Sequence, residues 1–172
     1  MRNLKLFLLT SAFILATGLA ANAQEWTKFA PEGGRFEVML PGPPEASTET
    51  KDSANGPYTT KMYIVRTDDM IFMVAYVDYD PKFNFDVKAE IQANKTNFLK
   101  PFAEGKLLSE KEITFNGSPG LEFAADLNAA RTVVSRIFVI GKRPYQMIAV
   151  NPKGADQTVV WKFHDSFKTT KG

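Results

Sequence analysis

Residues 116–150 read NGSPGLEFAADLNAARTVVSRIFVIGKRPYQMIAV, and residues 158–167 read TVVWKFHDSF. Apolar residues alternate with polar or small ones over 121–127, which is the period of a half-buried strand. Residues 133–140 are largely apolar on both faces, so they are predicted to form a central strand. Asn116-Gly117 is a strong hairpin signal. The stretch therefore predicts three strands joined by tight turns and an amphipathic helix. One face of that helix is expected to carry Val160, Phe163, His164 and Phe167.

The chain before this stretch adds further strands and a second helix. Residues 35–40 and 107–115 have strand alternation, and residues 58–66 and 70–79 are predicted to form a hairpin. Residues 45–57 are polar and are expected to be a long loop or a poorly ordered edge.

A helix is predicted from Asn84 or Asp86 to about Phe102, with either residue able to cap it. Its apolar stripe contains Val87, Ile91, Phe98 and Phe102. Short turns between strands predict an antiparallel sheet, and strands apolar on both faces predict layers above and below it. The fold class is thus predicted to be α+β, an α/β/α sandwich with about 6–7 antiparallel strands and helices on both faces.

The first 23 residues have the organisation of a secretory signal peptide. Arg2 and Lys5 precede an apolar run, and residues 21–23 (ANA) form a cleavage site. The run is short for a membrane span, so an anchor is the weaker interpretation. The prediction is a signal peptide at 1–23, a single domain at 24–172 that does not span a membrane, and a periplasmic or secreted location.

Charge and cysteine usage narrow the possible functions. Removing the signal leaves 19 basic residues against 19 acidic ones, and such a balance gives no support for nucleic-acid binding. The chain has no cysteine, which excludes thiol catalysis and thiolate metal sites. Its 14 phenylalanines and 44% hydrophobic content can supply a core without disulfides. No motif indicates a cofactor or a metal.

Five short motifs resemble the PsbP-like superfamily, whose members include PsbP and the Ran-binding Mog proteins. They are residues 33–38 (GGRFEV), 40–44 (LPGPP), 117–123 (GSPGLEF), 143–147 (RPYQM) and 163–167 (FHDSF). The resemblance lies in their order and spacing over most of the chain after residue 23. It implies an α/β/α sandwich and a non-enzymatic binding or assembly role, with no particular ligand. His164 stands where the superfamily more often has an aliphatic residue.

His164 is the only histidine, so histidine-based catalysis would have to use it. A triad with Ser166 or Ser135 can be written, but no nucleophile-elbow motif surrounds either serine. The favoured interpretation is a partly buried, hydrogen-bonded helix residue. No catalytic residue is therefore assigned.

Three further groups of side chains are possible sites with simpler structural explanations. The carboxylates Asp68, Asp69, Asp78 and Asp80 could bind a hard cation, but they lack the spacing of a calcium loop. Arg131, Arg136, Lys142 and Arg143 could form a basic patch, although Arg136 is expected to pair with Glu122 or Asp126 on the neighbouring strand. Tyr58, Tyr63, Tyr76 and Tyr79 could line a groove or a partner surface, or simply form strands.

Three functions are consistent with these observations. The leading hypothesis is an exported, non-enzymatic PsbP-like domain that binds a partner protein or a small ligand. The first alternative is a hydrolase that uses His164. The second is a carrier of an apolar ligand, which a cavity lined by Phe98, Phe102 or Phe163 would favour, whereas a flat tyrosine-rich face would favour a protein partner.

Overall fold

A computed structural model describes residues 25–53, 56–84, 86–102 and 105–170. The predicted signal peptide lies outside these residues. Ten strands and two helices occur in the described part of the chain. In chain order they are β1 (Thr27–Phe29), β2 (Phe36–Leu40), β3 (Glu45–Lys51), β4 (Tyr58–Arg66), β5 (Ile71–Tyr79), α1 (Val87–Leu99), β6 (Lys106–Phe115), β7 (Ser118–Asp126), β8 (Arg131–Ile140), β9 (Arg143–Pro152), α2 (Thr158–Asp165) and β10 (Lys168–Thr169).

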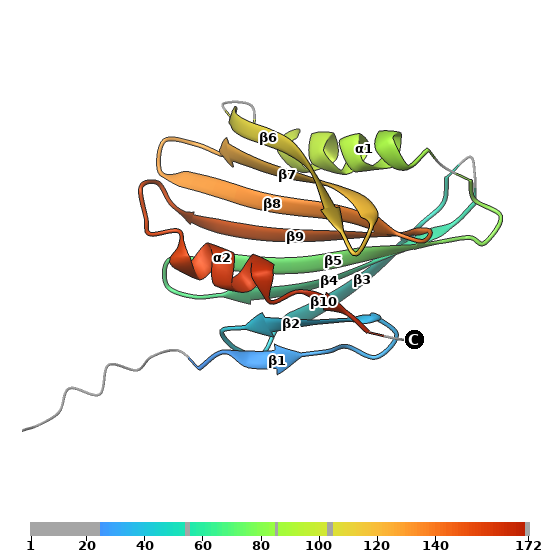
Figure 1. Cartoon of the computed structure of the whole chain (residues 1–172), viewed down its shortest axis with the longest axis horizontal. Helices are drawn as coiled ribbons and strands as arrows, with labels where there is room; N and C mark the ends of the chain where they lie inside the picture. Colours follow the sequence, from blue (N-terminus) through green and yellow to red (C-terminus); the bar gives the residue numbers. More distant parts are fainter. Residues whose placement is uncertain (1–24, 54–55, 85, 103–104, 171–172) are drawn as a thin grey trace, which may run out of the picture.

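Seven strands form one antiparallel sheet in the order β3-β4-β5-β9-β8-β7-β6 (Figure 1). The hairpins β4–β5, β6–β7, β7–β8 and β8–β9 come from short turns, as the sequence predicts. The pairing of β5 with β9 joins the two halves of the chain, with Phe72 opposite Ala149. The α+β class and the antiparallel sheet are therefore confirmed.

A second sheet of three strands, in the order β1-β2-β10, was not predicted. Residues 36–40 do form a strand, but it belongs to this small sheet. The partners of β2 are three and two residues long, which is too short for a detectable period. Of the two alternatives for residues 45–57, the edge is the one found, and residues 45–51 form a regularly paired edge strand, β3. All seven of its side chains are exposed, so it lacks the apolar alternation that marks a strand.

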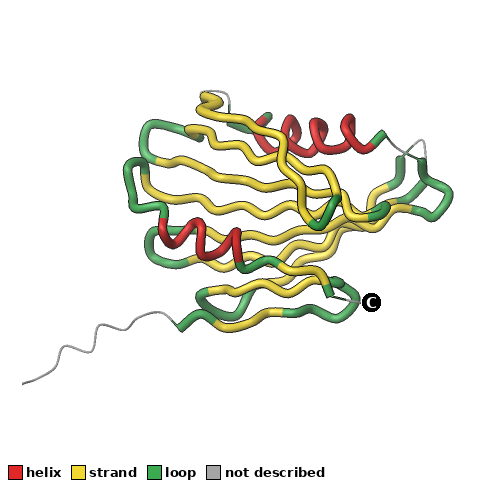
Figure 2. Tube along the Cα trace, in the orientation of Figure 1, coloured by secondary structure: helices red, strands yellow, loops and turns green. Residues whose placement is uncertain are grey.

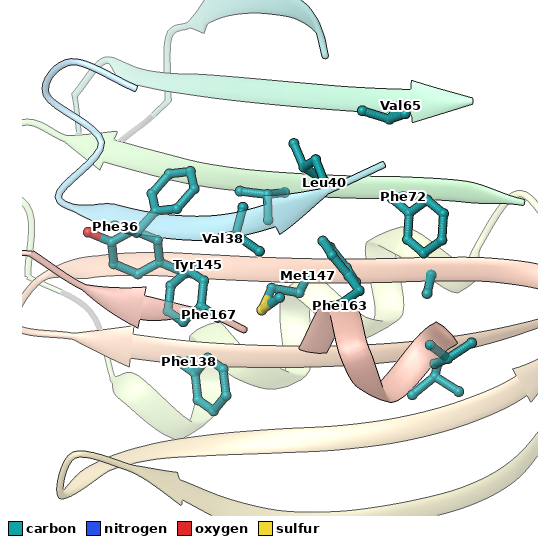
Figure 3. Close-up of a cluster of buried hydrophobic side chains, with 14 of the residues drawn as sticks. Phe36, Val38, Leu40, Val65, Phe72, Phe138, Tyr145, Met147, Phe163 and Phe167 are labelled. Carbon is teal, nitrogen blue, oxygen red and sulfur yellow. The ribbon is translucent and has the colours of Figure 1, made fainter. Parts of the chain in front are cut away.

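The buried side chains form two separate clusters, and each cluster contains one helix. Figure 3 shows the first, in which Phe163 of α2 lies near Met147 of β9 and packs against Phe72 of β5, while Phe36 of β2 stacks on Phe167. The second contains Ile91 of α1 with residues of β7, β8 and β9. Neighbouring residues of a strand point to opposite faces, and accordingly Val134 joins the first cluster and Val133 the second. The strands apolar on both faces are thus packed on both faces.

The helices cover different regions of the large sheet. Helix α2 lies toward the small sheet, whereas α1 lies toward β6 and β7 (Figure 2). Asp86 caps α1 as predicted, because the Ala89 amide donates to its Oδ1 at 2.7 Å. At α2 the capping position is Gln157, and the Oδ1 of the preceding Asp156 accepts from the Thr158 amide at 3.0 Å. Within the described residues, neither helix is long and apolar enough to cross a membrane.

Candidate functional site

His164 lies against the interior of the large sheet, with 2% of its surface exposed. Its Nε2 is 3.2 Å from the Val134 carbonyl oxygen, so Nε2 carries the proton and donates it. Nδ1 is buried without a hydrogen-bond partner among the described residues. Burial, reinforced by the Arg136 charge, lowers the pKa of His164 to about 3. The residue is a neutral core histidine, as the favoured interpretation expects, and is more deeply buried than predicted.

The two serines of the possible triad bond to other groups. Ser166 Oγ donates to the Phe163 carbonyl at 2.7 Å and accepts from the Met39 amide at 2.9 Å, which ties α2 to β2. Ser135 Oγ accepts from the Gln146 side-chain amide at 3.2 Å. In the part of the chain that the structure describes, neither serine is hydrogen-bonded to His164. The sequence-based triad is therefore not assembled.

The four aspartates lie at the two ends of one hairpin. Asp68 and Asp69 are in the turn between β4 and β5, whereas Asp78 and Asp80 lie at the far end of β5. At the rise of an extended strand Asp69 and Asp78 are about 30 Å apart, so the four carboxylates do not meet at one cation. Asp78 pairs with Arg143 at 2.5 Å, and Asp80 accepts from the Lys82 amide at 2.8 Å. Residues 25–53, 56–84, 86–102 and 105–170 contain no cluster of three acidic or histidine side chains suited to a metal.

The predicted basic patch is also dispersed, because Arg131 lies at the start of β8 and Lys142 and Arg143 lie beyond its end. Arg136 Nε contacts Glu122 Oε2 at 2.7 Å, which confirms one of the two expected pairings. A second bond of 2.7 Å joins Arg136 to Asp165 of α2.

Glu122 is the acidic centre of this network. Burial alone would raise its pKa, but hydrogen bonds from Arg136 and Lys111 outweigh burial, and the pKa lies below its ordinary value. Asp126, the other expected partner of Arg136, pairs instead with Lys153 at 2.6 Å.

The four tyrosines divide between the two faces of the hairpin. Tyr63 and Tyr76 pack with Phe36 in the cluster of α2. Tyr58 and Tyr79 are cross-strand partners on the side of α1, with ring centroids 5.8 Å apart. The Tyr79 hydroxyl donates to Glu90 Oε1 of α1 at 2.6 Å. Tyr58 and Tyr79 line a concave surface on the side of α1, to which Tyr76 also contributes.

That concave surface, the α1 groove, lies between α1 and strands β4 and β5 and has a volume of about 370 Å³. Its apolar lining residues are Tyr58, Met62, Met73, Ala75, Val77, Tyr79 and Phe98. The groove exists because α1 packs over β7, β8 and β9 and leaves the same side of β4 and β5 without a helix. Met62, Met73 and Phe98 consequently remain half-buried.

Polar groups line the rim of the α1 groove. Asn94 is fixed by donating to the Glu90 carbonyl and carboxylate, at 2.9 and 2.8 Å. Asn97 is exposed and makes no side-chain hydrogen bond with the described residues. Lys51 of β3 also lines the groove. An apolar floor with a few polar rim groups is the usual form of a small-molecule site.

A larger cleft of about 800 Å³ lies between the first turns of α1 and strands β6 and β7. We consider it the weaker candidate despite its size. Among the described residues its lining contains no aromatic ring and no methionine, and its floor residues Ile91 and Leu121 are only 6% and 2% exposed. The α1 groove offers half-buried methionine and phenylalanine side chains instead. Phe98, proposed from the sequence as a cavity residue, lines the α1 groove. Phe163, proposed with it, is instead fully buried in the core.

Similarity to known proteins is confined to structure. No protein-family model and no curated protein matches the sequence. Cyanobacterial PsbP (CyanoP) from Synechocystis is similar with a TM-score of 0.55 and 8% identity, over 90% of this chain and 98% of that one. The Ran-binding protein Mog1p of Saccharomyces cerevisiae gives 0.45 and 12%, over 87% and 97% of the two chains. A protein from Bacteroides thetaiotaomicron gives 0.42 and 13%, over 84% and 48%.

The match to CyanoP spans nearly the whole of both chains and agrees with the resemblance drawn from the sequence motifs. At this identity it describes the fold and carries no ligand or partner with it. The chain has a PsbP-like fold.

Proposed function

We propose that this protein is an exported, non-enzymatic binding protein that holds a small apolar, ring-containing ligand in the α1 groove. The signal-like residues 1–23 support export to the periplasm or the exterior. The two core clusters, each with its own helix, support an α/β/α sandwich with helices on both faces. Its PsbP-like fold is compatible with a binding role.

The observation that carries the proposal is the apolar floor of the α1 groove. Met62 of β4 and Met73 of β5 are diagonal neighbours on one face of the sheet, and both are half-buried. Phe98 of α1 lines the same groove. Methionine adapts its shape and contacts aromatic rings favourably. Tyr58 and Tyr79 add aromatic rings at one end, where Tyr79 is stacked on Phe83 at 4.4 Å between ring centroids. Such a lining suits a ligand with a ring and few charges.

Two side chains with catalytic potential, His164 and Glu90, have structural partners, which supports a binding role over hydrolysis. His164 is 2% exposed and cannot reach a ligand in the α1 groove, because it belongs to the other face of the sheet. Glu90, which does line the groove, accepts hydrogen bonds from Tyr79 and Asn94. The bond from Tyr79 holds α1 against β5, whereas the bond from Asn94 lies within α1.

Filling the groove tests the proposal. Ala93 is an exposed residue of α1 that lines the groove, and Ala89, one turn earlier, is exposed but does not line it. The neutral fluorophore N-phenyl-1-naphthylamine serves as the probe. We expect wild type and Ala89→Trp to bind it with the same affinity, and Ala93→Trp to bind it at least about tenfold more weakly because the indole occupies the site.

Circular dichroism of both variants controls for folding. Equal binding by Ala93→Trp and Ala89→Trp would show that the probe binds elsewhere, and no binding by wild type would refute an apolar small-molecule site. In that case a protein partner for the same face becomes the better hypothesis. Mass spectrometry of the protein recovered from a periplasmic extract checks export, since cleavage as proposed leaves Gln24 as the first residue.

A further inference from the structure

The two edges of the large sheet are protected to very different degrees. At one edge, β6 has an irregular register between Leu107 and Ser109, and its Glu110 bonds to Lys95 of α1 at 2.8 Å. Irregular registers and occupied side chains discourage another strand from pairing. At the other edge, β3 pairs with β4 in an unbroken register over all seven residues. Every β3 side chain is exposed, so nothing in the described chain covers its outer edge.

The sequence of β3, EASTETK, is complementary to itself in the antiparallel direction. When a second copy is placed so that Thr48 faces Thr48, all seven residues find a partner. Glu45 then faces Lys51 of the second copy, and Lys51 faces its Glu45, so two opposite-charge pairs form at the ends. Opposite charges directly across an antiparallel pair stabilise it.

Neighbouring registers lack this complementarity. A pairing centred on Ser47 places Glu45 opposite Glu49 of the second copy, and one centred on Glu49 places two Glu49 side chains face to face. Like charges directly opposite each other are destabilising. A pairing centred on Thr50 leaves part of β3 without a partner. Of these registers, only the one centred on Thr48 both pairs all seven residues and places opposite charges across from each other.

Existing contacts do not prevent this pairing. Glu45 is bonded to Arg66 at 3.0 Å and Lys51 to Glu49 at 2.9 Å, and all four side chains are more than half exposed. Exposed ion pairs contribute little to stability and rearrange readily. Lys51 can thus turn from Glu49 toward Glu45 of another copy at low cost.

We propose that the protein forms a two-fold symmetric dimer in which two β3 strands pair about Thr48 and extend the large sheet from one copy into the next. Because paired strands keep the same face, both α1 grooves open on the same side of the joined sheet. The two grooves lie next to the shared edge, since Lys51, Tyr58 and Met62 belong to the outermost strands. This inference stands independently of the ligand proposal.

Sedimentation-velocity measurements over a concentration series test the dimer with charge reversals. We expect Glu45→Lys and Lys51→Glu each to weaken the dimer by about tenfold, since each replaces two attractions with two repulsions. Mixing the two variants should give a heterodimer, because the lysines of one chain then face the glutamates of the other. The double variant Glu45→Lys/Lys51→Glu should again form a homodimer. Lys82→Glu, an exposed reversal outside β3, is the matched control.

Several outcomes would overturn the proposal. A wild-type protein that stays monomeric throughout the series rules out the dimer. A dimer that persists equally in both single variants uses another surface. Variants that weaken the dimer but fail to associate when mixed would exclude the register centred on Thr48.

Discussion

Replacing His164 by leucine provides a direct test of its burial. In the folded chain the pKa of His164 is about 3, whereas a histidine in the unfolded chain has a pKa near 6.5. Between these two values the unfolded chain binds a proton that the folded chain does not. The free energy of unfolding therefore decreases as the pH falls through 6.5, and this decrease stops below about pH 3.

The two pKa values set the size of the effect. The difference between the two pKa values lowers the free energy of unfolding by about 2 kcal/mol between pH 7 and pH 5. At lower pH the total decrease reaches at most about 5 kcal/mol. Leucine is close to histidine in size and does not titrate. We expect His164→Leu to change stability at pH 7 by no more than about 1 kcal/mol, because it loses the bond to Val134 but removes the unpaired Nδ1.

Urea denaturation followed by fluorescence of Trp26 and Trp161 measures the difference. The wild-type midpoint should fall relative to that of His164→Leu by about 1 M urea between pH 7 and pH 5. Carboxylates titrate in both proteins, so their contribution cancels in the comparison. A histidine ring signal that titrates near pH 6.5 in the NMR spectrum of the folded protein, or midpoints that shift in parallel, would contradict the burial of His164.

Two further substitutions test the packing around β7. A Cβ atom at Gly120 would lie 2.6 Å from the Ile137 carbonyl oxygen and from the Phe138 ring, so Gly120→Ala should destabilise the fold by about 1–3 kcal/mol in urea denaturation. Gly42→Ala is its control, since a Cβ there meets only Val65 at 3.8 Å, and equal losses for both would refute the steric argument. Glu122→Gln should cost about 1–2 kcal/mol by weakening its bond to the half-buried Arg136, whereas Glu112→Gln, in an exposed pair with Lys88, should change stability by less than about 0.5 kcal/mol. The stabilisation by ionised Glu122 is present at neutral pH and lost as the pH falls through its lowered pKa. The free energies of unfolding of Glu122→Gln and Glu112→Gln should therefore become equal in acid.

Periodicity predicted the part of the fold where burial differs between the faces of a strand. The hairpin of β4 and β5, the meander from β6 to β9 and both helices follow from the alternation or the helical stripe of their own residues. The small sheet does not, because β1 and β10 are held by pairing with β2 and not by a pattern of their own. β3 was expected to be a loop or a poorly ordered edge for the same reason. Its side chains are all exposed, and backbone pairing with β4 orders it.

The candidate site was less predictable than the fold. Because β5 is apolar on both faces, the sequence predicted packing layers on both faces of the sheet. Helix α1, however, does not extend over Met62 and Met73. The reach of a helix over a sheet depends on where the helix begins and crosses, which no local pattern specifies. The four tyrosines, like the four aspartates, are close in the chain and were each treated as one possible site. Alternate residues of a strand point to opposite faces of the sheet, which separates the tyrosines into two pairs. The length of β5 separates the two pairs of aspartates.

The two proposals meet at Lys51, which lines the α1 groove and faces Glu45 of the second copy in the proposed dimer. Ala93→Trp changes the groove without touching β3, and Glu45→Lys changes the interface without lining the groove. Lys51→Glu changes both. If Glu45→Lys and Lys51→Glu weaken binding of N-phenyl-1-naphthylamine equally at a concentration where wild type is dimeric, the second copy completes the groove. If Lys51→Glu alone weakens it, the lysine acts within its own chain, and ligand binding does not depend on dimer formation.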